Sequence, residues 1–470
     1  MLRLDPSVAL LTPEERFGLD VLVDQARVLP TTDLAADVVR LMASESLVLS
    51  FDAWTAGSPG IVETDGLVTV SRDVLRHVTA VAGAAAEQRS GARDGHGRVP
   101  STEHPLVRLG RERIPVVTET ATALRDAVVR AAGRRLLRVL APWPNGHRWA
   151  AAFTHDVDVV SGWPAFTALR LVELMSKRHF AVAARVGSAA AWSVFGNPPW
   201  QGVADVITCE QTADVPSTWF VLSGTPTLDT MRVGDLTYRP ESPGARRMLA
   251  AIVAAGDEIG LHGSFATMDG GAPVFDAQRR RLSAVSGTVP RGVRQHYLRL
   301  RPGATQRALV AAGFMYDATY GFPDRNGFRL GSADVVPAWD AASGAPLALD
   351  EVPLIWMDRA LSKYQGVEDP EAWINDALVL ADRCRAGNGL WVGLWHCNLT
   401  PALGYPGAPA AYTRLVTEIV QREPWLAPLD AIVAWRRVRR RLRATRVAPD
   451  GRLALDGVPA GTVIQFDNAS

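Results

Sequence analysis

The chain is poor in cysteine. Only Cys209, Cys384 and Cys397 occur among its 470 residues, and no two of them form a C-x-x-C pair. An odd number of widely spaced cysteines argues against a disulfide framework of the kind that stabilises small secreted domains. This cysteine usage is typical of a reducing compartment and predicts a cytoplasmic protein.

The sequence also lacks a strong charge of either sign and any long apolar run. Lysine and arginine number 50 against 49 aspartates and glutamates, so the formal net charge is +1. Such a balance gives no reason to expect nucleic acid or an anionic membrane as a partner. No basic stretch followed by an apolar one opens the chain, and the best apolar run, residues 180–196, contains Arg185. We therefore expect neither a secretory signal nor a transmembrane segment.

The length suits two or three domains. We expect an N-terminal accessory region over residues 1–145, a catalytic unit over 146–405 and a C-terminal extension over 406–470. The first region is predicted to be mainly helical, with candidate caps at Thr12 and Thr32. Its expected helices are residues 13–26, 34–47, 75–87 and 116–140. Whether this region covers a groove or docks a partner is left open.

From residue 149 onward, short apolar segments alternate with longer amphipathic ones. Such alternation predicts βαβ units and a parallel sheet, either open or closed into a barrel. Six or seven units over about 250 residues favour the barrel. The expected strands are residues 149–155, 218–223, 258–262, 291–296, 313–317, 349–355 and 389–396, and the expected helices are 163–178, 243–255, 274–285, 304–312 and 370–386.

After residue 400 the sequence predicts helices at 410–421 and 429–443, followed by a hairpin-like tail. The second helix includes a basic segment, residues 435–446. One interpretation is a patch for an acidic membrane or nucleic acid. The other, which we favour, is a helix docked through apolar side chains with its arginines on the solvent side. The docking side chains would be Ile432, Trp435, Val438 and Leu442.

The stretch Phe153-Thr-His-Asp156-Val-Asp158 carries the strongest functional signal. It reads as a buried strand that ends in two carboxylates within an otherwise apolar setting. Burying carboxylates is costly unless a metal, an arginine or hydrogen-bond donors compensate them. An active site at the end of this strand is therefore predicted.

Further polar residues end the later strands. They are His262, the run Arg294-Gln-His296-Tyr297, the segment from Asp317 to Arg329, and the pair Trp395-His396. The carboxyl ends of parallel strands share one edge of a sheet, so these side chains are expected to meet. A carboxylate with imidazoles is a normal ligand set for a hydrolytic Zn²⁺ or a similar divalent ion.

The ordered motifs Thr154-His-Asp156-Val-Asp158, Leu261-His262-Gly-Ser, Arg294-Gln-His-Tyr and Leu394-Trp-His396 resemble those of the polysaccharide deacetylase superfamily (carbohydrate esterase family four, chitooligosaccharide deacetylase-like). They are similar to bacterial members whose first motif is T-H-D-V-D. The resemblance covers about residues 148–400, and Asp94-Gly-His-Gly-Arg98 resembles a region that often precedes such domains. It implies a distorted (β/α) barrel of about seven strands and metal-dependent removal of an acetyl group from a sugar.

The resemblance also implies roles for individual residues. Asp156 matches the general base, Arg294 the arginine that orients it, and His396 the general acid. Asp158 and His262 match metal ligands, and the expected cofactor is a divalent metal, foremost Zn²⁺, with Co²⁺ or Ni²⁺ as alternatives. The metal would polarise the acetyl carbonyl and activate a water, while the base and the acid move protons.

One position departs from the family pattern. A second metal histidine usually lies four residues after the first, and here that position is Ala266. His296, at the end of the next strand, is the natural substitute. The alternative is that His296 binds substrate or packs, while metal binding is weak or lost. His155 lies between two residues of the site face, so we expect it on the opposite face in a core or supporting role.

Three further residues are candidates for substrate contact, namely Tyr297, Asp317 and Trp395. Asp317 and Arg329 either shape the groove or serve the fold. In the second case Asp317 would cap the following turn and Arg329 would pair with a surface acid.

Together these observations predict a metal-dependent hydrolase that removes acetyl from an N-acetylated sugar or glycoconjugate intermediate. Without a secretion signal, a small saccharide, nucleotide sugar, lipid-linked sugar or glycosylated metabolite is a better candidate than a cell-wall polymer. One alternative keeps the site and hydrolyses another non-peptide C–N bond. The other, motivated by Ala266, is a catalytically degenerate carbohydrate-binding or scaffold protein.

Overall fold

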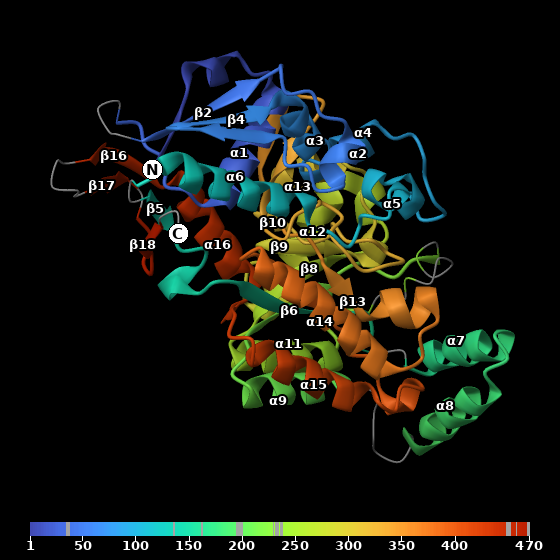
Figure 1. The fold of residues 1–470 in the computed structure, drawn as a ribbon. Helices are drawn as coiled ribbons and strands as arrows, with labels where there is room; N and C mark the ends of the chain where they lie inside the picture. The colour runs from blue at the N-terminus through green and yellow to red at the C-terminus, as the bar shows by residue number, and fades with distance from the viewer. Residues whose placement is uncertain are drawn as a thin grey trace.

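The computed structural model describes residues 1–470 apart from 34–37, 135–136, 161–162, 194–200, 229, 231–234, 236–237, 448–452, 457 and 468–470. A large, mostly parallel sheet occupies its centre (Figure 1). Nine strands follow the order β11-β12-β10-β9-β8-β7-β6-β14-β13, and β15 pairs with the beginning of β6. Among the described residues of this sheet, only β11 and β12 pair antiparallel. The strands are β6 (Ala150–Val157), β7 (Ser217–Leu222), β8 (Glu258–Gly263), β9 (Gly292–Gln295), β10 (Tyr316–Asp317), β11 (Val336–Asp340), β12 (Ala345–Glu351), β13 (Trp356–Met357), β14 (Leu390–Leu394) and β15 (Trp425–Leu426).

The predicted α/β barrel is confirmed in an open form. The sheet curls into a half-barrel, and in the described residues its end strands, β11 and β13, do not pair with each other. All seven predicted strands are present, with the sixth shifted to Ala345–Glu351. The strands β11 and β13 were not predicted, because β11 contains Pro337 and an acid and β13 has only two residues.

Strand β6 shows how the sequence builds the core. Every residue from Ala150 to Val157 is buried, so neither face of this strand meets solvent. Ala151 and Phe153 pack into one hydrophobic cluster, while Ala150 and Ala152 pack into another on the opposite face. The period-two alternation of strand side chains thus distributes one apolar run between two cores.

Helices connect the strands of this sheet, and two of them, α7 and α8, project away from it (Figure 1). Each predicted helix between residues 163 and 386 is present, and α8 and α9 were not predicted. Among the described residues, no helix is both long and apolar enough to cross a bilayer. The helices are α7 (Trp163–Ser176), α8 (Phe180–Ser193), α9 (Gln201–Thr212), α11 (Pro243–Ala255), α12 (Thr267–Ser286), α13 (Ala304–Ala311) and α14 (Pro370–Ala386).

The N-terminal region contains a second sheet that was not predicted. Its strands β1 (Leu2–Leu4), β2 (Val39–Ser44), β4 (Leu67–Ser71) and β3 (Ile61–Thr64) pair in that order. The helix predicted over residues 34–47 is wrong where it can be judged: residues 34–37 lie outside the described part, and Val39–Ser44 is a strand. Its buried positions alternate with less buried ones, a period of two that was misread as helical.

Among the described residues of this region, more lie in helices than in strands. Thr12, a predicted cap, begins α1 (Pro13–Ala26) and forms a capping box in which Glu15 reaches back to the Thr12 N–H. The helix predicted over 116–140 ends earlier, because α6 (Val116–Ala132) stops at Gly133 and β5 (Leu137–Leu140) follows. The other helices are α2 (Phe51–Thr55), α3 (Arg72–Ala82), α4 (Ala85–Arg89) and α5 (Pro105–Arg108).

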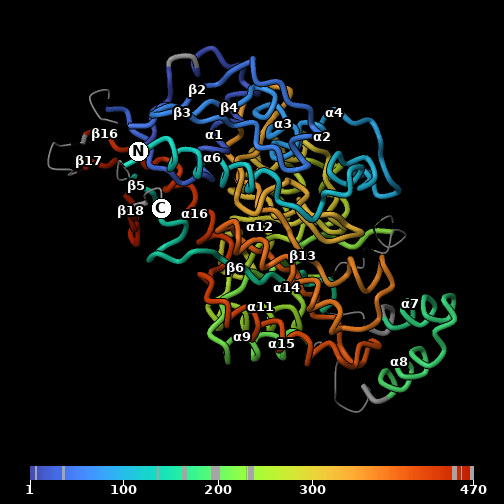
Figure 2. The backbone as a smooth tube through the Cα atoms, in the orientation of Figure 1, coloured from blue at the N-terminus to red at the C-terminus, as the bar shows by residue number. Residues whose placement is uncertain are grey.

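The C-terminal segment runs back to the N-terminal region, as Figure 2 shows in red and blue. After α15 (Ala408–Val420) and α16 (Leu429–Arg441), the predicted hairpin forms from β16 (Arg443–Val447) and β17 (Leu453–Asp456). Strand β18 (Ile464–Asp467) pairs with β5. Met1 and Leu29 share a hydrophobic cluster with Leu442 and Ala444. The division of the chain at residues 145 and 405 stays a prediction.

Helix α16, which holds most of the basic segment, is docked, as the favoured interpretation expected. Ile432 and Trp435 are buried, whereas Val438 is exposed. Two arginines contradict the expected arrangement: Arg436 and Arg439 are buried rather than on the solvent side. Both lie on the face of α16 that also contacts α1, where Asp24 accepts their ion pairs.

Candidate metal and catalytic site

The structure brings the predicted site residues to one edge of the large sheet. Asp156, His262 and Arg294 belong to the ends of β6, β8 and β9. Asp158 and His296 directly follow β6 and β9, and His396 lies two residues after the end of β14. Most of them line one cleft of about 130 Å³. The members of that lining among these six are Asp156, Asp158, His262, His296 and His396. The parallel register of the strands is what aligns their carboxyl ends.

Three of these side chains form a set that a metal ion would fit. Asp158 Oδ1 lies 3.3 Å from His262 Nε2 and 3.6 Å from His296 Nε2. Ligand atoms of all three residues lie within 4.8 Å of one another. Asp158 Oδ1 and His262 Nε2 are buried and have no hydrogen-bond partner among the described residues. One carboxylate and two imidazoles with such unpaired lone pairs match the donor set of Zn²⁺ and similar ions.

The second nitrogen of each imidazole is held from behind. His262 Nδ1 lies 2.9 Å from the carbonyl oxygen of Arg294, and His296 Nδ1 lies 3.0 Å from Asp235 Oδ1. Because a carbonyl or carboxylate oxygen only accepts, each Nδ1 donates and each Nε2 presents its lone pair toward Asp158. Such supporting hydrogen bonds are the usual way in which proteins orient metal-binding histidines.

Electrostatics at this set favour a charged carboxylate. Burial opposes it, but the neighbouring imidazoles of His262, His296 and His396 lower the pKa of Asp158. Conversely, burial would lower the pKa of His262, yet the carboxylates of Asp156 and Asp158 raise it. A cation at this position would therefore compete with a proton on His262.

Asp156 is fixed by a buried arginine. Arg294 is fully buried, and its Nη1 donates to Asp156 Oδ1 at 3.1 Å and to Thr154 Oγ1 at 2.8 Å. Its Nε donates to the carbonyl of Ala318, and its guanidinium lies 4.4 Å from the centre of the Phe220 ring. The second carboxylate oxygen, Oδ2, stays on the His262 side, 3.8 Å from Nε2. Asp156 thus keeps one oxygen free to take a proton.

His396 sits opposite, beside a carboxylate that was not predicted. Its Nδ1 lies 2.7 Å from Asp358 Oδ1, and Asp358 Oδ2 accepts the backbone N–H of His396. Burial lowers the pKa of His396, but Asp358 and Asp158 raise it overall. Its Nε2 lies 3.8 Å from Asp158 Oδ2, so the proton that Asp358 favours faces the cleft.

Of the three predicted substrate contacts, only Tyr297 lines the cleft. Its ring stacks on His296 with centroids 4.0 Å apart, and its φ of 60° is uncommon for a bulky residue. Trp395 does not reach the cleft, because neighbouring residues point to opposite sides of the chain and His396 takes the inner one. Its ring packs instead against Trp356 and Tyr412 in the core.

Asp317 does not reach the cleft either. It is fully buried, and its Oδ1 accepts the backbone N–H and the hydroxyl of Thr319. It therefore caps the following turn, which was the structural alternative. Arg329 pairs with a buried acid, Glu87, rather than shaping a groove. His155 lies behind β6 as expected, between Glu210 Oε1 and the carbonyl of Trp395, each at 2.9 Å.

Asp317 has a buried carboxyl neighbour that makes the stability of the fold pH-dependent. Glu351 is its parallel partner on β12, and both side chains are buried. Burial raises the pKa of Asp317 to about 7, and burial and the charge of Asp317 raise the pKa of Glu351 well above its usual range. The folded state then binds protons more tightly than the unfolded chain.

Stability should therefore be highest below about pH 4, as far as this pair is concerned, and should fall as the pH rises through 7. Between pH 5 and 8, the free energy of unfolding of Glu351→Gln should fall by about 1–3 kcal/mol less than that of the wild type. Urea unfolding across that range measures it, with the exposed Glu371→Gln as the matched control. A wild-type curve parallel to that of Glu351→Gln would contradict the shifted pair.

Basic residues that were not predicted also line the cleft. Arg359 and Lys363 come from the segment after β13, and Arg98 comes from the N-terminal region. Arg98 Nη1 donates to the carbonyl of Tyr297 at 2.5 Å. The loop that contains Asp94-Gly-His-Gly-Arg98 therefore forms part of the cleft wall. At least this part of the N-terminal region thus lies at the cleft.

Comparison with known proteins returned only distant matches. No protein-family model matches the chain, and no curated protein sequence matches it. A putative polysaccharide deacetylase from Mycobacterium smegmatis is similar with 22% identity and a TM-score of 0.43, covering 65% of this chain and 96% of that one. A family 4 carbohydrate esterase from Streptomyces lividans, in complex with acetate, has 12% identity and a TM-score of 0.31, with coverages of 59% and 90%.

A third similar structure is a CE4 family pseudoenzyme from Bacillus anthracis, with 10% identity and a TM-score of 0.31. It covers 60% of this chain and 65% of its own. These three structures carry the names of the superfamily that the motifs resemble. None of them tests the T-H-D-V-D subgroup, which stays a prediction.

Proposed function

We propose that this protein is a metal-dependent carbohydrate deacetylase. One observation carries the proposal: a three-residue cation set, an arginine-held carboxylate and a carboxylate-held imidazole surround one cleft. Hydrolysis of an amide needs an activated water, a base for its proton and an acid for the departing amine. The cleft offers one candidate for each requirement. The resemblance of the motifs to those of polysaccharide deacetylases indicates that this amide is the acetylated nitrogen of a sugar.

Asp158, His262 and His296 would hold the cation. When bound there, a divalent cation supplies Lewis-acid chemistry, polarising a carbonyl and lowering the pKa of water. Zn²⁺ suits two imidazoles and a carboxylate, and Co²⁺ or Ni²⁺ would accept the same donors. The site thus has its carboxylate-plus-two-imidazole set although Ala266 replaces the usual second histidine, because His296 comes from the next strand.

The remaining residues would move protons. Asp156 takes the proton of the attacking water on Oδ2, since Oδ1 is occupied by Arg294. Arg294 keeps that carboxylate oriented toward the attacking water. His396 then donates from Nε2 to the departing nitrogen, while Asp358 stabilises the imidazolium at Nδ1. A protein that only bound carbohydrate would have no use for both of these paired groups.

The walls of the cleft favour a substrate with negative charge near the acetylated sugar. Arg98, Arg359 and Lys363 line it together with Tyr297 and Tyr364. Guanidinium and ammonium groups bind phosphate, and aromatic rings pack against sugar rings. Among the predicted substrates, a nucleotide sugar or a diphosphate-linked sugar fits these walls better than a neutral saccharide.

Acetate release tests the proposal. Enzyme loaded with Zn²⁺, Co²⁺ or Ni²⁺ would be offered N-acetylglucosamine, a chito-oligosaccharide and a nucleotide-diphosphate N-acetylglucosamine. We expect acetate from at least one of them, abolished by chelator and restored by added metal. Metal-loaded protein that binds these sugars without releasing acetate would instead favour the degenerate, carbohydrate-binding alternative.

A further inference from the structure

A second and much larger cavity lies away from the catalytic cleft. Its volume is about 990 Å³, and none of the six catalytic or metal-site residues lines it. Its walls come from α1, from β11 and β12 with their connection, and from the end of α16 together with Arg443. It therefore lies where the C-terminal helix meets the N-terminal region. Cavities of this size are typical of small-molecule sites.

One wall of this cavity is apolar. It includes Phe17, Val21, Trp339, Pro346 and Leu349. The rings of Phe17 and Trp339 pack against each other with centroids 4.9 Å apart. Such a surface matches a hydrocarbon chain or a ring system rather than water.

The charged part of the lining is strongly unbalanced. Eight arginines and three aspartates line the cavity, and no lysine or glutamate does. Four of these arginines come from α16, and three of the four, Arg437, Arg439 and Arg440, project toward α1 and β12. These arginines, which make α16 conspicuous in the sequence, thus point into the molecule.

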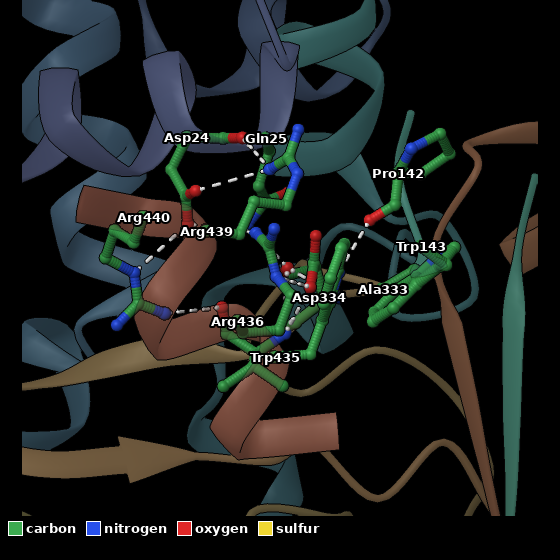
Figure 3. Close-up of polar contacts among 12 residues, drawn as sticks. Asp24, Gln25, Pro142, Trp143, Ala333, Asp334, Trp435, Arg436, Arg439 and Arg440 are labelled. Atoms are coloured by element: carbon green, nitrogen blue, oxygen red, sulfur yellow. Dashed lines mark hydrogen bonds and ion pairs between the residues drawn. The ribbon is translucent and has the colours of Figure 1, made fainter. Parts of the chain in front are cut away.

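The buried part of this cluster has more cations than anions. Arg27, Arg436 and Arg439 are buried, and Arg437 and Arg440 complete the ion-pair network. Three carboxylates face these five guanidinium groups: Asp24 pairs with three of them, and Asp334 and Asp350 with two each. Figure 3 shows Asp24 and Asp334 among Arg436, Arg439 and Arg440. Each arginine has a carboxylate partner, but the five guanidinium groups exceed the three carboxylates by two positive charges.

Among the network arginines that line the cavity, Arg439 and Arg27 carry unused donors. Arg439 is 4% exposed and lines the cavity, and its Nε and Nη2 have no hydrogen-bond partner among the described residues. The same holds for the Nε of Arg27, which also lines the cavity. Burial and the charge of Arg436 lower the pKa of Arg439. A buried guanidinium without its full set of acceptors is costly, so a missing anion is the natural complement.

We infer that this cavity binds a phosphate-bearing amphiphile, with its dianionic phosphate at the arginines of α1 and α16 and its apolar part along the Phe17–Trp339 wall. A phosphate monoester supplies two charges, which equals the excess of the network, and its oxygens match guanidinium donors. The ligand is either a bilayer lipid or a free phosphorylated metabolite. Both share this chemistry.

Decyl phosphate, below the concentration at which it forms micelles, is the probe. We expect calorimetric binding to the full-length protein and, at a hundredfold excess over Kd, a rise in Tm of about 2–3 °C. Arg439→Met should abolish both effects without lowering the Tm of the ligand-free protein, because it removes a buried charge with two unused donors and leaves Asp24 paired with Arg436 and Arg440. Arg280→Met, which changes net charge equally at an exposed position outside the cavity, should bind like wild type.

Several results would overturn the inference. If the neutral decyl maltoside binds as tightly as decyl phosphate, the cavity has no preference for an anion. If inorganic phosphate binds as tightly, the apolar wall contributes nothing to binding. If Arg439→Met binds decyl phosphate like wild type, Arg439 does not contribute to the site. A ligand-free Tm lowered by Arg439→Met would assign that residue to the fold. If Arg439→Met does not fold, the exposed rim pair Arg441→Ala/Arg443→Ala replaces it and should weaken binding at least threefold.

Sedimentation with vesicles that contain phosphatidic acid distinguishes a bilayer lipid from a free phosphorylated metabolite as the ligand. Cosedimentation that Arg439→Met abolishes would identify a bilayer lipid. Binding of monomeric decyl phosphate without cosedimentation would identify a free amphiphile. Because none of the six catalytic or metal-site residues lines this cavity, acetate release by Arg439→Met stays at the wild-type level whether or not the anion site exists.

Discussion

Asp156→Asn is expected to lower kcat for acetate release by about 10²–10⁴-fold, the range that a lost general base usually costs. Asparagine keeps an oxygen for the hydrogen bond from Arg294 but cannot accept a proton at the pH of the reaction. The proposed cation set does not include Asp156, so metal content should stay at the wild-type level. Initial rates of acetate release, beside elemental analysis of the same preparation, measure both quantities.

The matched control is Asp382→Asn, an exposed aspartate that pairs with Arg422 on the surface and should keep full activity. The reason for measuring the metal in parallel is that a variant that lost the ion would also lose activity. Substantial turnover by metal-loaded Asp156→Asn would remove Asp156 from the role of base. The proton would then have to go to another group of the cleft, and His396 is the nearest alternative.

Much of this site could be predicted because its residues stand at the ends of strongly apolar strands. Every position of β6 and β14 is buried, and so is every position of β8 except the first. Such apolar runs are recognisable without a structure. Parallel pairing then brings the carboxyl ends of these strands to one edge. The meeting of Asp158, His262 and His396 follows from those two facts alone.

The two acids behind the histidines could not be predicted in the same way. Asp358 follows β13, a strand of only two residues that leaves no pattern in the sequence. Asp235 is brought to His296 from the long connection between β7 and α11, which has no strand of its own among its described residues. Tertiary contacts alone bring both carboxylates to their histidines.

Asp317 and Trp395 show the opposite error. Both stand in or directly after strands of the sheet, so proximity in sequence suggested the cleft. Side-chain direction decides otherwise: Asp317 points to Glu351 and Thr319, and Trp395 points to the core tryptophans. A position at a strand end therefore indicates the correct edge of the sheet but not which face of the strand the side chain occupies.

The N-terminal sheet was missed for a related reason. Residues 38–44 combine apolar residues with two polar ones, and without partners such a short segment reads as either helix or strand. Pairing with β1 and β4 decides the outcome, because it buries Val39 and Leu41 against α1.

The second large effect concerns His296, whose role decides whether Ala266 marks a lost metal site. We expect about one divalent ion per chain in wild type, and loss of that ion, or at least a hundredfold weaker binding, in both His262→Ala and His296→Ala. The reason is that each removes one of three donors whose atoms lie within 4.8 Å. Competition with a chromogenic chelator measures the affinity, and His179→Ala, an exposed histidine that pairs with Glu368, is the control.

Asp235→Asn separates a ligand from its support. It leaves all three donors in place but replaces the carboxylate that holds His296 Nδ1, so metal binding should weaken by about 10–100-fold rather than vanish. The order of affinities, wild type above Asp235→Asn above His296→Ala, would place His296 in the ligand set. If His296→Ala instead binds the ion as tightly as wild type while KM rises, His296 contacts the substrate, and the cation would rest on Asp158 and His262 with a donor from outside this set.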